Sequence, residues 1–143
     1  MRLQKIIERL QKLHPKKDLS LDRVKNLCEK LGNPQDNLDC ISVIGTNGKY
    51  STIQTLRAIL EEANINYNVY TSPHVQKINE RFVYNNKEID DNSLANLLGE
   101  VEEINNNGTI TFYEILTSAF FYGANKFDKN INIVETGLFH RFD

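Results

Sequence analysis

The feature that most constrains the fold is a short apolar run that passes directly into a glycine-bearing turn and then into an amphipathic helix. Residues 40–44 (Cys-Ile-Ser-Val-Ile) are flanked by polar residues and are too short for a typical helix, so we predict a buried strand. Residues 45–48 (Gly-Thr-Asn-Gly) form the turn, and apolar residues return at helical spacing over 53–63. Strand, tight turn and helix in this order are the context that a phosphate-binding loop requires.

The rest of the sequence alternates between the same two kinds of element. Apolar spacing predicts further helices over residues 3–13, 21–31, 94–104 and 112–123, and further strands over 67–71 and 131–134. Asn85-Asn86, between two short apolar runs, predicts a hairpin with a tight turn. Strands that alternate with helices imply right-handed βαβ units, and therefore an α/β fold with a mainly parallel sheet.

Polar residues at the helix ends support these assignments. Ser20 is expected to cap the second helix and Gly32 to end it, while Asp90 or Asp91 is expected to cap the helix that follows the hairpin. Thr111 and Glu114 have the spacing of a capping box, in which each side chain accepts from the other residue's backbone amide.

Composition excludes several classes of protein. The 143 residues suffice for about one domain, with 40% hydrophobic and 25% charged residues and a net charge of −2, as in a globular protein without a dedicated nucleic-acid surface. No apolar stretch approaches a membrane span, and the N-terminus does not resemble a signal peptide. Cys28 and Cys40 have no CxxC partner, so we expect reduced core cysteines and a cytoplasmic protein.

The most informative segment is residues 45–52, GTNGKYST. Glycines let the backbone turn tightly so that several amides face one anion, and the helix N-terminus adds partial positive charge. Lys49 is placed to reach the outer phosphates of a nucleotide, and a hydroxyl on the first helical turn can ligate Mg²⁺. The match to GxxxxGK[ST] is imperfect, because Val43 holds the place of the first glycine and Tyr50 directly follows the lysine. The alternative is a glycine-rich turn with an exposed lysine.

A second candidate is Glu135, which follows the last apolar run. A carboxylate at the C-terminal end of a parallel strand lies at the edge where such sheets bind ligands, and it can hold Mg²⁺ directly or through water. The alternative is an ordinary solvated carboxylate.

Five motifs in order resemble the folylpolyglutamate synthase/dihydrofolate synthase family of the Mur ligase superfamily. LGNP at residues 31–34 resembles LGxP, GTNGKYS at 45–51 resembles GTNGKGS, and TSPH at 71–74 with Glu80-Arg81 resembles TSPH…ER. TFYE at 111–114 resembles TFFE, and ETGL at 135–138 with Arg141 and Asp143 resembles EVGLGGRLD.

The resemblance implies a partial three-layer, P-loop-type α/β domain with flanking helices: a helical leader over residues 1–38 and a partial ATP-binding domain over 39–143. It implies an enzyme that phosphorylates a folate or dihydropteroate carboxylate with ATP and Mg²⁺, after which the amine of L-glutamate attacks the acyl phosphate. The nucleotide-binding residues would be Gly45, Thr46, Asn47, Gly48, Lys49, Ser51 and Thr52, with Lys49 also catalytic. The metal would be bound by Ser51, Ser72 and Glu135.

The same resemblance places His74, Arg81, Phe112 and Tyr113 near the substrate. For each residue a structural alternative stands beside this interpretation. His74 is expected to be structural more often than catalytic, and Arg81 is equally well a solvated hairpin residue. Phe112 lies on the apolar face of its helix, whereas Tyr113 lies off that face and is the better ligand contact.

Three departures from the family pattern leave alternatives open. Tyr50 replaces a glycine, either crowding the phosphates or turning outward, and Phe139-His140 replaces a glycine pair. The sequence is also about a third of the family's length, so we expect a fragment without the C-terminal domain. Alternatives to the ligase are a catalytically inactive nucleotide-binding or interaction module and, less favoured, a small kinase. We expect a monomer with small-molecule partners, and neither a nucleic acid nor a membrane among them.

Overall fold

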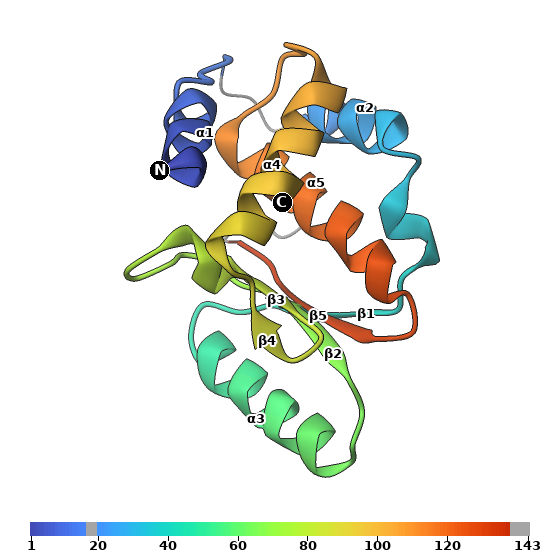
Figure 1. Cartoon of the computed structure of the whole chain (residues 1–143). Coiled ribbons are helices and arrows are strands. Elements are labelled where there is room, and N and C mark those ends of the chain that lie inside the picture. The colour runs from blue at the N-terminus through green and yellow to red at the C-terminus, as the bar shows by residue number, and fades with distance from the viewer. Residues whose placement is uncertain (17–19, 138–143) are drawn as a thin grey trace.

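The computed structural model describes residues 1–16 and 20–137, which form an α/β fold as predicted (Figure 1). The α-helices are α1 (Arg2–Gln11), α2 (Asp22–Lys30), α3 (Lys49–Glu62), α4 (Asp91–Asn105) and α5 (Phe112–Ala124). Three short 3-10 helices are η1 (Pro34–Asn37), η2 (Ile78–Arg81) and η3 (Asn125–Phe127). The strands are β1 (Cys40–Val43), β2 (Tyr67–Tyr70), β3 (Phe82–Tyr84), β4 (Lys87–Glu88) and β5 (Ile131–Glu135).

The five strands form one sheet in the order β1-β5-β2-β3-β4. β5 runs parallel to both β1 and β2, whereas β3 is antiparallel to β2 and to β4. The predicted hairpin is confirmed: Asn85 and Asn86 have φ angles of 49° and 70°, the positive values that a tight hairpin turn requires. The three parallel strands end at one edge of the sheet, where the segments after β1, β2 and β5 meet.

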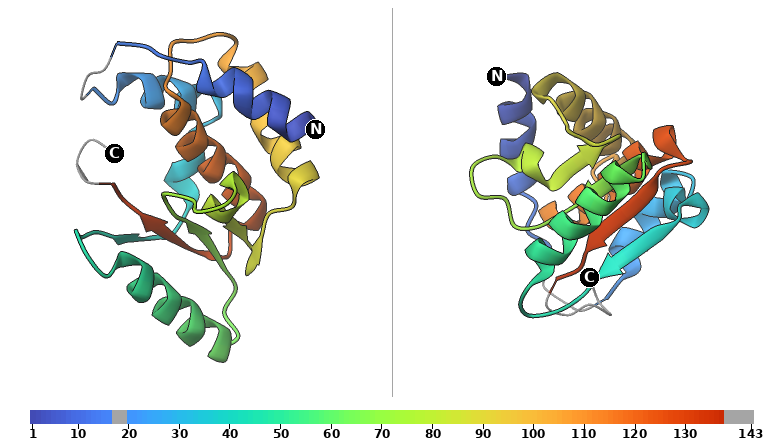
Figure 2. Two further views of the ribbon diagram at one scale, coloured as in Figure 1. Left: turned by 90° about the vertical axis from the view of Figure 1, so that its left-hand side faces the viewer. Right: turned by 90° about the horizontal axis from the view of Figure 1, so that it is seen from below.

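Helices cover both faces of the sheet and make three layers. α3 lies against one face, and α1, α2, α4 and α5 form a layer on the other (Figures 1 and 2). Side chains alternate along β2, so Tyr67 and Val69 pack in the core beneath α3 while Tyr70 packs in the core of the four-helix layer. Ile133 of β5 likewise belongs to the α3 core and is fully buried.

The predicted helix ends are confirmed in the backbone hydrogen bonds, except at the start of α2. Asp90, rather than Asp91, caps α4 by accepting from the Ser93 amide at 2.8 Å. The prediction for Ser20 is wrong: the N-cap of α2 is Leu21, and Ser20 lies one residue earlier, where its Oγ accepts from the Asp22 amide at 3.1 Å. Gly32 follows the end of α2 with a φ of 83°, which favours glycine. None of the helices in the described ranges is long and apolar enough to cross a membrane.

Burial of β1 differs from the sequence prediction. Only Val43 is buried in this strand, and Ile41 is 39% exposed, because β1 lies at an edge of the described sheet and pairs with β5 alone. The prediction of two core cysteines is therefore half wrong: both thiols are free, but Cys28 is buried and Cys40 is exposed. Desolvation is the main cause that raises the pKa of the buried Cys28 thiol.

Candidate nucleotide-binding site

The loop between β1 and α3 has the backbone geometry of an anion site. Gly45 and Gly48 adopt φ angles of 153° and 76°, a region that favours glycine, and a Cβ on Gly48 would meet open space. Gly48 is the N-cap of α3 and provides no side-chain cap, so the first-turn amides of α3 are left for an external acceptor. Thr46 and Asn47 are exposed on the same loop. The loop can therefore present several amides and a helix N-terminus to one anion.

Lys49 links this loop to the end of β5. Its Nζ lies 3.3 Å from the Thr136 carbonyl oxygen and 3.8 Å from Glu135 Oε1. Thr136 also donates its amide and its hydroxyl to the Val43 carbonyl, at 3.1 and 3.3 Å. Sequence reasoning missed the role of Thr136, although it follows Glu135 directly in one of the five motifs. The Lys49 ammonium is thus held at the shared edge of β1 and β5.

Glu135 is also held on its other side. Its Oε2 accepts from the Ser72 amide at 3.1 Å, and Ser72 lies just beyond β2. The structure therefore brings together three predicted site residues: Lys49 at the start of α3, Ser72 just beyond β2, and Glu135 at the end of β5. Glu135 is not the freely solvated carboxylate of the alternative interpretation, because its side chain is only 11% exposed.

The two predicted hydroxyls on α3 differ in their surroundings. Thr52 Oγ1 donates to the Gly48 carbonyl at 2.9 Å, so this hydroxyl is engaged within the helix. Ser51 is exposed on the first turn. Tyr50 is 74% exposed, so its ring turns outward into solvent, which decides between the alternatives that the sequence left open for this position.

The oxygen donors near the loop fit Mg²⁺. This ion is usually held by one or two carboxylates together with substrate phosphates. Glu135 provides a carboxylate, and Ser72 beside it and Ser51 on the first turn of α3 carry hydroxyl oxygens. Within residues 1–16 and 20–137 no group of three His, Cys, Asp or Glu side chains forms a separate metal cluster. The arrangement therefore suits a metal that arrives with a nucleotide better than a metal held by protein alone.

A second set of predicted residues gathers around Arg81. Arg81 is 5% exposed, so the interpretation as a solvated hairpin residue is wrong. Its Nε donates to His74 Nδ1 at 2.8 Å, and its guanidinium carbon lies 5.5 Å from the centroid of the Tyr113 ring. Desolvation, followed by the charge of Arg81, lowers the pKa of His74. Tyr113 is 62% exposed, so one face of this cluster is open to a ligand.

Glu80 has a positioning role that sequence reasoning missed. One carboxylate oxygen accepts from the amides of Val75, Gln76 and Lys77 at 2.9, 2.7 and 3.0 Å. These backbone hydrogen bonds lower the pKa of Glu80. The sequence feature that could have identified Glu80 is its place directly before Arg81 in the TSPH…ER motif. The carboxylate fixes the course of the segment that carries Ser72 and His74.

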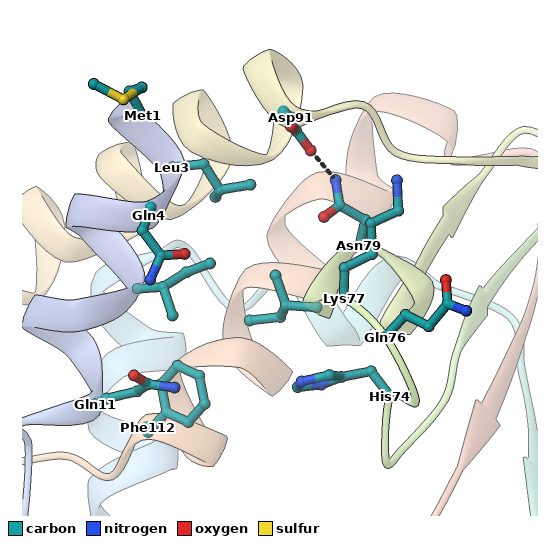
Figure 3. A pocket seen from close by; sticks show the side chains of 12 residues that line it. Met1, Leu3, Gln4, Gln11, His74, Gln76, Lys77, Asn79, Asp91 and Phe112 are labelled. Atoms are coloured by element: carbon teal, nitrogen blue, oxygen red, sulfur yellow. Dashed lines mark hydrogen bonds between the residues drawn. The ribbon is translucent and has the colours of Figure 1, made fainter.

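His74 and Phe112 point into one cavity of about 400 Å³ between α1 and the segment after β2 (Figure 3). Asn79 borders the same cavity and donates to Asp91 at 2.9 Å. Phe112 and Tyr113 together line a second cavity of about 330 Å³ with residues 13–15. Three of the four predicted substrate residues, His74, Phe112 and Tyr113, thus border these two cavities. Arg81 lines neither cavity and is connected to them through its contacts with His74 and Tyr113. Leu138, Phe139, His140, Arg141 and Asp143 lie outside the described residues.

Comparison with known proteins identifies longer relatives. The chain is 37% identical over 130 residues to dihydrofolate synthase/folylpolyglutamate synthase of Bacillus subtilis (strain 168), an alignment that covers 86% of this chain and 30% of the relative. A bifunctional folylpolyglutamate synthase/dihydrofolate synthase from Yersinia pestis CO92 superimposes with a TM-score of 0.90 at 29% identity, covering 99% of this chain and 35% of that one.

A further crystal structure, of a bifunctional folylpolyglutamate synthase/dihydrofolate synthase with Mn, AMPPNP and L-glutamate bound, superimposes with a TM-score of 0.89 at 30% identity. The superposition covers 99% of this chain and 34% of that one. No protein-family model matches the sequence. The chain spans about a third of the length of these relatives.

Proposed function

Because this chain belongs to the folylpolyglutamate synthase/dihydrofolate synthase family, we propose that it is the nucleotide-binding part of an ATP-dependent ligase. The reaction would join L-glutamate to the carboxylate of folate or dihydropteroate through an acyl phosphate, with release of ADP and phosphate. The observation that carries this proposal is the convergence of Lys49, Ser72 and Glu135 beside the amides of the β1–α3 loop. A bound nucleotide analogue, metal and L-glutamate in a solved relative agree with it.

In this proposal the loop binds the phosphates of ATP. The amides of residues 45–48 face the phosphate oxygens, with Thr46 and Asn47 at the rim and Thr52 supporting the Gly48 carbonyl. Lys49 lies beside Glu135 and Thr136, from which its ammonium can turn to the outer phosphates. Lys49 then neutralises charge that develops as the phosphoryl group is transferred.

Ser51, Ser72 and Glu135 are the residues that would hold Mg²⁺. When bound, the ion neutralises phosphate charge and orients the transferring group. Glu135 is positioned for this role by the Ser72 amide, which fixes one of its oxygens. Lys49 balances the carboxylate charge in the absence of a nucleotide.

Arg81, His74, Tyr113 and Phe112 are the proposed substrate contacts. In the described part of the chain the Arg81 guanidinium has no carboxylate partner, although it is nearly fully buried. A buried cation of this kind favours an anionic group of a ligand nearby. The exposed Tyr113 ring provides a flat apolar face for a pterin. A cytoplasmic location, a monomeric state and a boundary near residue 38 stay predictions.

A catalytically inactive nucleotide-binding module is the second candidate. It is favoured by Tyr50, which stands where the family pattern has a glycine at the start of α3. The two candidates share the nucleotide site and differ in turnover, so one experiment distinguishes them.

The test measures MgATP binding by this chain by calorimetry. ADP release with dihydropteroate or folate plus glutamate is measured in a chimera in which this chain replaces the matching segment of the Bacillus subtilis relative. We expect Lys49→Ala to weaken MgATP binding by about tenfold or more, because a cation beside the phosphates is lost. Lys126→Ala is the matched control, since Lys126 is exposed on η3 near the opposite end of β5. Circular dichroism checks that both variants are folded.

Binding with ADP release supports the ligase, and binding without ADP release supports the inactive module. If the protein binds no MgATP, or if the two lysine variants bind alike, the proposed phosphate loop is wrong.

A further inference from the structure

The sequence has two Asn-Gly pairs, Asn47-Gly48 and Asn107-Gly108. Asparagine followed by glycine is the dipeptide most prone to spontaneous deamidation, since glycine has no side chain to hinder attack by its own nitrogen on the asparagine amide. The reaction also needs a free glycine N–H and room for the backbone to rearrange. The two pairs share the same chemistry, so their surroundings decide which one reacts.

Gly108 is enclosed and its amide is engaged. Its N–H donates to the Asn105 carbonyl at 2.9 Å, and its own carbonyl accepts from Asn105 Nδ2 at 3.0 Å. A Cβ placed on Gly108 would lie 2.9 Å from Asn105 Oδ1 and 3.4 Å from Lys30 Nζ. The nitrogen at position 108 is therefore neither free nor able to move easily.

Gly48 is the opposite case. A Cβ placed there would meet no atom within 4 Å. Asn47 and Asn107 are both exposed, so the two pairs differ in the surroundings of the glycine. Across residues 1–16 and 20–137 the Gly48 N–H has no acceptor, whereas its carbonyl is used by Thr52. The open loop that leaves amides free for an anion thus also leaves a nucleophile beside the Asn47 side chain.

We propose that Asn47 is a site of spontaneous deamidation within the phosphate loop. The Gly48 nitrogen attacks Asn47 Cγ and gives up its proton; a new bond from this nitrogen to Cγ forms as the Cγ–Nδ2 bond breaks. Nδ2 takes up one proton and leaves as ammonia. Water then opens the cyclic imide at either carbonyl to give aspartate or isoaspartate. The net change is uptake of one water and loss of one ammonia, with no oxidant or cofactor.

The consequence for binding rests on the proposed nucleotide function. Deamidation places a carboxylate on the loop near Lys49, whose ammonium already lies 3.8 Å from Glu135, and directs negative charge at the anion site. A phosphate that accepts from the Gly48 amide would in turn occupy the nucleophile. Nucleotide therefore protects the loop, and the empty loop loses its ability to bind nucleotide over time.

The test incubates the 143-residue protein at mildly alkaline pH and follows both pairs by peptide mapping, using the mass increase of about 1 Da and an isoaspartate assay. One arm contains no nucleotide and one contains saturating MgATP.

In parallel, MgATP binding is measured for Asn47→Asp, the reaction product, and for Asn107→Asp, which carries the same charge change at the other pair. We expect faster modification at 47 than at 107 without nucleotide, and clear slowing at 47 alone with MgATP. We expect a loss of affinity of about tenfold or more only in Asn47→Asp.

If deamidation without nucleotide at Asn47 is as slow as at Asn107, or slower, the inference is overturned. Unchanged reaction at Asn47 under MgATP concentrations that calorimetry shows to be saturating overturns the protection by nucleotide. If calorimetry detects no MgATP binding at all, the proposed function fails, while the comparison of positions 47 and 107 still decides the modification site.

Discussion

At the scale of single residues, the pair formed by His74 and Arg81 is sensitive to protonation. Arg81 Nε donates to His74 Nδ1, so this nitrogen must carry a lone pair and the imidazole must be neutral. A proton on that nitrogen would place a donor and a positive charge against the buried guanidinium. Desolvation and Arg81 lower the pKa of His74 from 6.5, and the weaker opposing effect comes from Glu80. Tyr113 contributes the face of its ring to the same cation.

We predict that stability falls as pH is lowered below 6.5, the ordinary pKa of histidine. In that window the unfolded protein takes up a proton at position 74 and the folded protein does not, so protonation favours unfolding until pH reaches the folded pKa. Urea unfolding at several pH values should show that the free energy of unfolding of the wild type falls with falling pH. The slope of free energy against pH should be smaller in His74→Gln. The control His14→Gln, at a histidine outside the Arg81 cluster, should keep the wild-type slope. If the free energy of unfolding changes with pH in the same way in all three proteins, the prediction is wrong.

At the scale of elements, the start of α5 is fixed by a capping box and by a second helix. Thr111 Oγ1 accepts from the Glu114 amide at 3.1 Å, and Glu114 accepts from the Thr111 amide at 3.2 Å. The same carboxylate accepts two hydrogen bonds from Arg23 of α2, at 3.1 and 2.9 Å. Since Phe112 and Tyr113 occupy the first turn of α5, these contacts set the direction of the proposed substrate residues.

We predict that Glu114→Ala lowers the free energy of unfolding by about 1–3 kcal/mol, because a cap and a partly buried ion pair are lost together. Glu114→Gln keeps an acceptor for the Thr111 amide and should cost less. Glu103→Ala, at an exposed glutamate of α4, should stay within about 0.5 kcal/mol of the wild type. Thermal or urea unfolding measures all three variants, and equal losses in Glu114→Ala and Glu103→Ala would refute the argument.

At the scale of the whole molecule, the last described strand lies inside the sheet, between β1 and β2. Buried amides hold the start of this strand: Asn68 Nδ2 donates to Asn132 Oδ1 at 2.9 Å, and Asn132 Nδ2 donates to the Asp39 carbonyl at 3.1 Å. Asn130 Nδ2 adds a hydrogen bond to Asn68 Oδ1 at 3.2 Å. These polar contacts connect β2, β5 and the residue before β1, so they help to fix the register that places Glu135 at the site.

We predict that Asn132→Ala lowers the free energy of unfolding by about 1–3 kcal/mol, because the buried Asn68 Nδ2 loses its acceptor, Asn132 Oδ1. Asn37→Ala, at an exposed asparagine of η1, is the control and should change stability little. Chemical unfolding compares the two variants. A neutral Asn132→Ala would show that the amide network does not support the sheet.

Local features could be predicted from the amino-acid sequence: the strand, turn and helix over residues 40–62, the Asn85-Asn86 hairpin, and the caps at Asp90 and Thr111. These follow from side-chain periodicity and turn chemistry, which act over a few neighbouring residues. The turn pattern selected Lys49, the strand-end position selected Glu135, and motif resemblance added Ser72. Long-range strand pairing brought the three to one edge of the sheet, because β5 pairs between two strands far earlier in the sequence. The same packing buried Arg81 and left Cys40 exposed on β1, since burial depends on which distant segments cover a residue.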